Sequence, residues 1–138
     1  MNTLHRNRPV VLAIDDEAEV LAEIAQALIP QGFECRTCQD AQSAIALARQ
    51  IVPDLIISDI NIAGHSGLDL CEAMKCEPGL FDVPVVFLSG AQIPDVVRRA
   101  REAGGTYYLR KPFDAQVLLE LVDKALWMPH LVKQQLAV

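Results

Sequence analysis

The sequence predicts an α/β fold built around a parallel β-sheet. Apolar residues fall into five short runs that alternate with five longer patterns of helical spacing. This alternation is typical of βαβ units, in which right-handed crossovers place helices on both faces of the sheet. The first, third and fourth runs are hydrophobic at nearly every position, as strands covered on both faces should be.

The expected strands are short runs rich in β-branched and aliphatic residues. The first reads VVLAI and the fourth reads PVVFL, and the third follows Pro53. In chain order, we expect strands at Val10–Ile14, Phe33–Cys38, Asp54–Ser58, Pro84–Leu88 and Thr106–Leu109.

The expected helices have apolar residues three and four positions apart. The first reads EAEVLAEIAQALI and is stopped by Pro30 and Gly32, and the fourth ends at Gly104 and Gly105. In chain order, we expect helices at Glu17–Ile29, Ala41–Gln50, Gly67–Cys76, Ile93–Ala103 and Asp114–Leu126. A length of 138 residues suits one domain, which we expect over residues 1–128, with 129–138 as a tail or the start of a linker.

Composition argues against several classes of protein. The net charge of −6 argues against direct nucleic-acid binding by this domain. No apolar run approaches the roughly 18–20 residues that a membrane helix needs. The N-terminal stretch lacks a secretory signal, so we expect a cytoplasmic protein.

The four cysteines do not form a convincing metal or disulfide pattern. Cys35 and Cys38 have the spacing C-x-x-C, but an odd separation on a strand puts them on opposite faces. Cys71 and Cys76 lie about 140° apart around a helix axis. We therefore expect reduced cysteines that pack as small hydrophobic residues.

Chemically active side chains follow four of the five strands. Asp15 and Asp16 follow the first strand, Asp59 the third, Ser89 the fourth and Lys111 the fifth. Each alone has an ordinary explanation as a helix cap, a turn residue or a solvated charge. In the strand order 2-1-3-4-5, however, the first and third strands are neighbours, and all five residues lie at the sheet edge where ligands bind. Three crowded carboxylates need a cation such as Mg²⁺. A lysine, a hydroxyl and a divalent cation around one carboxylate make a phosphoryl-binding site, which we therefore expect here.

Four motifs in this order, LAIDDE, SDINIAGHSGLDL, VVFLSG and GGTYYLRKPF, resemble those of the receiver domain of two-component response regulators. The resemblance extends over essentially Val10 to Leu126. It implies a flavodoxin-like, three-layer α/β/α fold, with a five-stranded parallel sheet in the order 2-1-3-4-5 and five helices.

The resemblance also implies roles for the acidic residues. Asp59 is the expected phospho-acceptor. Asp16 would bind Mg²⁺ directly, Asp15 largely through water, and the backbone carbonyl of Asn61 would be a further ligand; Mn²⁺ could substitute. The donor would be a sensor histidine kinase or a phosphotransfer protein. The chain would then be no enzyme beyond its own phosphorylation and autodephosphorylation.

The other matched residues are implied to transmit the signal. Lys111 would pair with the phosphoryl oxygens, and Ser89 would move toward them as Tyr108 changes rotamer. The Lys111–Pro112 peptide bond matches one that is cis in the family. The changed surface would be that of Ile93–Ala103 with the strand and helix that follow, and it would serve an effector domain or a homodimer.

Three positions depart from the family pattern. Ala63 stands where a proline is common, which predicts a less rigid loop after Asp59. Thr106 and Tyr107 stand where acidic residues often occur, which weakens the case for a charged dimer interface.

Two other interpretations fit an α/β chain. A phosphohydrolase of the haloacid-dehalogenase type also uses Mg²⁺ and an aspartate, but it expects an Asp-x-Asp pair after the first strand and a cap domain. A flavodoxin-like binding module would need a phosphate-cradling loop there, and the acids present would repel a phosphate.

Overall fold

The computed structural model describes residues 8–90, 98 and 107–127. Their main sheet has five parallel strands in the order β2-β1-β3-β6-β7. These strands are β1 (Val10–Ile14), β2 (Glu34–Cys38), β3 (Leu55–Asp59), β6 (Val85–Ser89) and β7 (Tyr107–Arg110). Numbered along the chain, they have the expected order 2-1-3-4-5, so the predicted fold class is confirmed.

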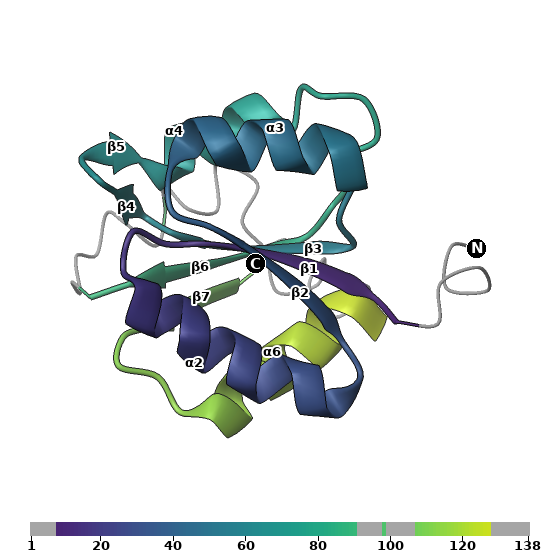
Figure 1. The fold of residues 1–138 in the computed structure, drawn as a ribbon, viewed down its shortest axis with the longest axis vertical. Coiled ribbons are helices and arrows are strands. Elements are labelled where there is room, and N and C mark those ends of the chain that lie inside the picture. The colour runs from purple at the N-terminus through teal and green to yellow at the C-terminus, as the bar shows by residue number, and fades with distance from the viewer. Residues whose placement is uncertain (1–7, 91–97, 99–106, 128–138) are drawn as a thin grey trace.

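The described helices form a layer on each side of the sheet. They are α2 (Ala18–Leu28), the 3₁₀ helix η1 (Ile29–Gln31), α3 (Ala41–Ile51), α4 (Gly67–Met74) and α6 (Ala115–Trp127). Figure 1 shows α3 and α4 over one face of the sheet and α2 and α6 over the other. The molecule therefore has the three layers of an α/β/α sandwich.

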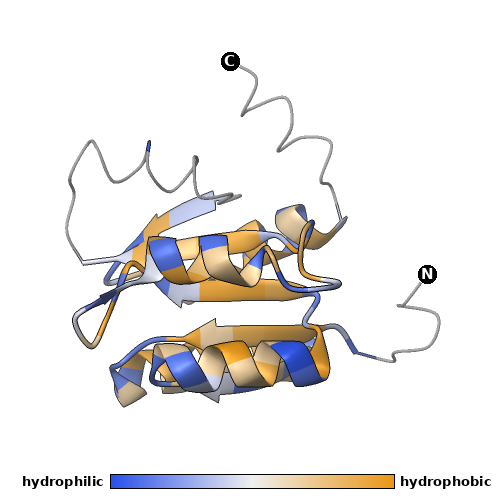
Figure 2. Cartoon of the chain, turned by 90° about the horizontal axis from the view of Figure 1, so that it is seen from above, coloured by the Kyte–Doolittle hydropathy of each residue, from blue (hydrophilic) through white to orange (hydrophobic). Residues whose placement is uncertain are grey.

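The alternation of side chains along each strand produces two hydrophobic cores. In β1, Leu12 and Ile14 pack in the core beneath α3 and α4, whereas Val11 and Ala13 pack in the core beneath α2 and α6. In Figure 2 much of the sheet is coloured as hydrophobic, whereas the helices carry both hydrophilic and hydrophobic residues. Burial on both faces explains the unbroken apolar runs.

Helix ends follow local chemistry. Asp40 caps α3 by accepting a hydrogen bond from the Ser43 N–H, and Ser66 caps α4 in the same way for Asp69. Pro30 lies inside η1, which extends the first helix by a 3₁₀ turn before Gly32 ends it at φ +96°. Helix α4 corresponds to the third expected helix, Gly67–Cys76. It ends at Met74, two residues before the expected end, because Cys76 already belongs to the following turn.

A small antiparallel hairpin, which was not expected from the sequence, follows β3. Its strands are β4 (Asn61–Ile62) and β5 (His65–Ser66). The two-residue turn between them has positive φ at both positions, +51° at Ala63 and +84° at Gly64. Positive φ at both positions is the signature of a type I′ turn, which usually selects Asn or Gly.

The expectation for the cysteines is confirmed only in part, because Cys76 is exposed and does not pack as a small hydrophobic residue. All four are free, with Cys71 buried and Cys76 exposed. Cys38 packs in the core beneath α3 and α4, and Cys35 packs against the opposite core, so the C-x-x-C pair does not converge.

Some expectations lie outside the described residues. The expected helix Ile93–Ala103 is described only at Arg98, which is helical and exposed. The expected tail 129–138 and the position of Thr106 are also outside the described ranges, so those expectations stay predictions.

Candidate functional site

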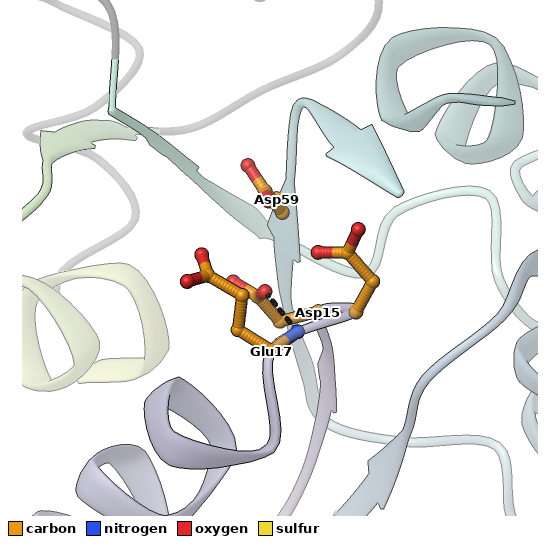
Figure 3. A group of neighbouring side chains, drawn as sticks. Asp15, Glu17 and Asp59 are labelled. Carbon is orange, nitrogen blue, oxygen red and sulfur yellow. Dashed lines mark hydrogen bonds between the residues drawn. The ribbon is translucent and has the colours of Figure 1, made fainter. Parts of the chain in front are cut away.

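The carboxyl ends of β1 and β3 bring four acidic residues together. Asp15, Asp16, Glu17 and Asp59 each offer a carboxylate oxygen, and these oxygens all lie within 4.8 Å of one another. Figure 3 shows Asp15, Glu17 and Asp59 converging from the ends of the two strands. The convergence of the three aspartates was predicted, whereas Glu17 was expected only as the start of a helix.

Asp15 lies at the base of this group and is completely buried. Its Oδ1 accepts a hydrogen bond from the Glu17 N–H at 2.9 Å, drawn as the dashed line in Figure 3. Its Oδ2 lies 2.8 Å from the Lys111 ammonium nitrogen. Burial raises the pKa of Asp15, although the neighbouring Lys111 and the hydrogen bond from Glu17 oppose that effect.

Lys111 follows β7 and is the cation of the site. Its Nζ lies 2.8 Å from Asp15, 3.1 Å from Glu17 and 3.2 Å from Asp59. Burial alone would lower the pKa of Lys111, but its contacts with Asp15 and Glu17 and the charge of Asp59 raise it overall. One ammonium group therefore faces carboxylates from two different strand ends.

Asp59 is the last residue of β3 and is 7% exposed. Its Oδ1 accepts a long hydrogen bond of 3.4 Å from the Asn61 N–H, and its Oδ2 faces Lys111. The carboxylate opens into a pocket of about 760 Å³. Besides Asp59, the pocket is lined by Asp16, Glu17, Asn61, Ser89 and Lys111, among others.

Gly67 allows the loop after Asp59 to turn back tightly. Its N–H donates a hydrogen bond of 2.6 Å to the carbonyl of Ile60. A Cβ at this position would overlap the backbone carbonyl oxygen of Asp59. A glycine is thus required at position 67 by close packing against the backbone of the candidate acceptor.

Asp16 and Asn61 lie at the exposed rim of the site. Oδ2 of Asp16 accepts a hydrogen bond from the Ala63 N–H at 3.0 Å. The side-chain oxygen of Asn61 accepts one from the Gly64 N–H at 3.2 Å. The β4–β5 hairpin, which follows β3, therefore contacts the rim of the site.

Ser89 and Tyr108 are placed on neighbouring strands. Ser89 ends β6, is 6% exposed and lines the pocket. Tyr108 pairs in register with Phe87 and is half-buried against the core beneath α3 and α4. Because Phe87 and Ser89 are two residues apart on one strand, Ser89 and Tyr108 face the same side of the sheet. The Lys111–Pro112 bond is cis, as expected.

A family model for the response regulator receiver domain matches residues 11–123, most of the chain. The chain belongs to this family. The haloacid-dehalogenase alternative has no support from the comparisons. The receiver assignment makes the protein a component of two-component signalling.

Known receiver-containing proteins agree with this assignment. The chain is 39% identical over 116 residues to the transcriptional regulatory protein PrrA of Mycobacterium tuberculosis, over 84% of this chain and 48% of that protein. It is 33% identical over 109 residues to the phosphate regulon transcriptional regulatory protein PhoB of Pseudomonas aeruginosa, over 79% of this chain and 48% of that protein. The receiver thus spans about half the length of these relatives.

A solved structure shows the same fold. The chemotaxis response regulator CheY4 of Vibrio cholerae superposes with a TM-score of 0.81 at 28% identity, over 86% of this chain and 99% of that one. No helix in the described part of the receiver is long and apolar enough to cross a membrane.

The acidic group has the character of a divalent cation site. Oδ2 of Asp15 is buried and, within the described residues, has the ion pair with Lys111 but no hydrogen bond. Carboxylate oxygens at this density repel one another, and one ammonium group cannot neutralise four of them. A hard cation with oxygen ligands fits both the donor set and the charge.

Proposed function

We propose that this receiver accepts a phosphoryl group on Asp59 from a sensor histidine kinase or a phosphotransfer protein. The observation that carries the proposal is the environment of the Asp59 carboxylate. This carboxylate opens into a pocket and lies 3.2 Å from the Lys111 ammonium nitrogen. It also belongs to a group of carboxylates whose oxygens lie within 4.8 Å of one another. A candidate nucleophile, a counter-charge for transferred oxygens and carboxylates that could hold a cation thus meet at one point.

The proposed cofactor is Mg²⁺, for which Mn²⁺ could substitute. Asp15, Asp16, Asp59 and the backbone carbonyl of Asn61 would hold it, and the exposed rim leaves room for the waters that Mg²⁺ usually keeps. When bound, the cation supplies positive charge for the phosphoryl oxygens in the transition state.

The proposed transfer is a single displacement at phosphorus. An Asp59 carboxylate oxygen attacks, the P–N bond of the donor phosphohistidine breaks, and its electron pair stays on the histidine nitrogen, which takes a proton. Lys111 stabilises the negative charge on the transferred oxygens, because it is already held 3.2 Å from Asp59. The product is an aspartyl phosphate, and water later hydrolyses it on the same domain. The proposal therefore includes no enzyme activity toward a separate substrate.

The proposed switch uses Ser89 and Tyr108. The transferred group carries a charge of about −1.5 to −2 beside Ser89, whose hydroxyl would turn toward it. Tyr108 faces the same side of the sheet and would follow into the space that Ser89 leaves. The altered surface would include β7 and α6, and would serve an effector domain or a second receiver.

PrrA and PhoB are transcriptional regulatory proteins, and the receiver covers 48% of each. These relatives favour an effector of that kind as the output. Direct nucleic-acid contact by the receiver itself is not part of the proposal, because its net charge is −6.

The test is intact-protein mass spectrometry after incubation with acetyl phosphate, with and without Mg²⁺. Wild type should gain the mass of one phosphoryl group only with Mg²⁺, and Asp59→Asn should gain none. Asp123→Asn, on the exposed side of α6, is the matched control and should gain the group as wild type does. A wild-type protein that gains no phosphoryl mass from an active donor would refute the proposal.

A further inference from the structure

The β4–β5 hairpin contacts two carboxylates that come from different strands. The Asn61 N–H is directed at Oδ1 of Asp59 at 3.4 Å, and the Ala63 N–H donates to Oδ2 of Asp16 at 3.0 Å. Asp59 ends β3, whereas Asp16 follows β1. The same short segment therefore spans the gap between the candidate acceptor and a candidate metal ligand.

We propose that Ala63 is a positioning residue for the metal site, acting through its backbone N–H on Asp16. This inference rests on the proposed Mg²⁺ site and adds a part of the chain that is not itself a ligand. The N–H contacts Oδ2 of Asp16, and the other carboxylate oxygen would serve the cation. This hydrogen bond holds the exposed Asp16 side chain in the orientation that metal binding requires. Less conformational entropy is therefore lost when Mg²⁺ binds.

The Ala63 N–H lies in a turn with an unusual backbone conformation. At φ +51°, the residue occupies the left-handed region, which disfavours side chains. The hydrogen bond from Gly64 to the Asn61 side chain and the antiparallel pairing of Ile62 with His65 hold the turn in place. A strained backbone residue at a candidate site, kept by several local bonds, points to a functional reason for the strain.

A proline at this position could not make the contact. Proline has no N–H to donate, and its ring fixes φ near −65°, far from the observed +51°. Ala63 stands where a proline is common in the family, and a less rigid loop is the prediction from that departure. In the structure the Ala63 N–H bonds to Asp16, a contact that a proline cannot make.

The first test measures Mg²⁺ affinity by isothermal titration calorimetry for wild type, Ala63→Pro and Ala63→Gly. Proline should weaken Mg²⁺ binding about three- to tenfold, because the charge-assisted hydrogen bond is lost. Glycine keeps the N–H and adopts positive φ without strain, so its affinity should stay within about twofold of wild type. Unchanged affinity in a folded Ala63→Pro variant would overturn the inference.

The second test does not require the proline variant to fold. Amide hydrogen exchange at Ala63 is compared between wild type and Asp16→Ala, without metal. Exchange at Ala63 should speed up several-fold in Asp16→Ala, while the Gly64 amide, which bonds to Asn61, should keep its rate. Equal Ala63 exchange in both proteins would overturn the inference. A wild type that binds no Mg²⁺ in the first test would instead refute the proposed metal site.

Discussion

The ammonium nitrogen of Lys111 lies 3.2 Å from Oδ2 of Asp59, although the two residues are 52 positions apart in the chain. The same nitrogen lies 2.8 Å from Oδ2 of the fully buried Asp15. The cation thus joins the ends of β1, β3 and β7. Its removal should affect both the folding and the chemistry of the domain.

Lys111→Met should destabilise the receiver when Mg²⁺ is absent. Asp15 would keep a buried carboxylate without its counter-charge, which costs about 1–3 kcal/mol. Added Mg²⁺ should restore part of the loss, since it supplies the missing positive charge. Urea unfolding with and without Mg²⁺ measures both effects. Lys124→Met, at an exposed position on α6, is the control, and equal stability of the two variants without metal would contradict the prediction.

Gly67→Ala should destabilise the fold and disturb the candidate acceptor. The added methyl group would overlap the Asp59 carbonyl oxygen, and both backbones must shift to accommodate it. Overpacking of this kind costs about 1–3 kcal/mol. Denaturant unfolding gives the stability, and acetyl phosphate labelling gives the rate, which should fall.

Gly90→Ala provides the comparison for Gly67. Among the described residues, a Cβ at Gly90 would meet nothing within 4 Å, so that variant should stay within about 0.5 kcal/mol of wild type. If Gly67→Ala proved as stable as Gly90→Ala, the close approach to Asp59 would not be a real constraint.

Val52→Gly should cost the protein little stability. Val52 caps the end of α3 at φ +44°, where a β-branched residue is strained by roughly 1–2 kcal/mol. The side chain is 37% exposed, so its removal also loses roughly 1–2 kcal/mol of burial. These two effects nearly cancel, and a net change of less than about 1 kcal/mol is expected in thermal or urea unfolding. Val117→Gly, at a 40% exposed position inside α6, relieves no such strain and should lose about 2 kcal/mol.

The stability of the receiver should fall at alkaline pH through Cys71. Burial raises the pKa of this thiol from its ordinary value of 9.0 to about 12. Below pH 9 both folded and unfolded chains hold the proton, so stability is full. Between pH 9 and about 12 only the unfolded chain releases it, and the free energy of unfolding should fall by about 1.4 kcal/mol per pH unit.

The contribution of Cys71 to this pH dependence can be isolated by comparing how steeply the unfolding free energy falls with pH, rather than by comparing absolute stabilities. Cys71→Ala should show a shallower decline of unfolding free energy over this pH range than wild type. Cys76→Ala, which removes an exposed cysteine, should keep the wild-type slope. Identical slopes in all three proteins would show that Cys71 does not carry the linkage.

The sheet and most of the site were predictable from the sequence, because both depend on patterns among residues that are close together in the chain. Unbroken apolar runs such as Val10–Ile14 mark buried parallel strands. Residues directly after those runs must lie at the carboxyl edge of the sheet. Asp15 and Asp59 therefore meet once the order of β1 and β3 is known.

The unpredicted parts depend on contacts between residues far apart in the chain. Glu17 reads as a helix start, and its 3.1 Å contact with Lys111 and its place beside the three aspartates put it in the site. The β4–β5 hairpin has strands of two residues and an alanine at positive φ, where turn rules favour Asn or Gly. The bond from Ala63 to Asp16 holds a turn that local propensity alone would not select.

The most direct test of the account is to locate the phosphoryl group on the chain. Wild type labelled with acetyl phosphate and Mg²⁺ is reduced with borohydride, which converts an aspartyl phosphate to homoserine, and its peptides are sequenced by tandem mass spectrometry. The account predicts homoserine at position 59 and at no other aspartate. Homoserine at position 15 or 16 would contradict it, because the nucleophile would then lie at the end of β1.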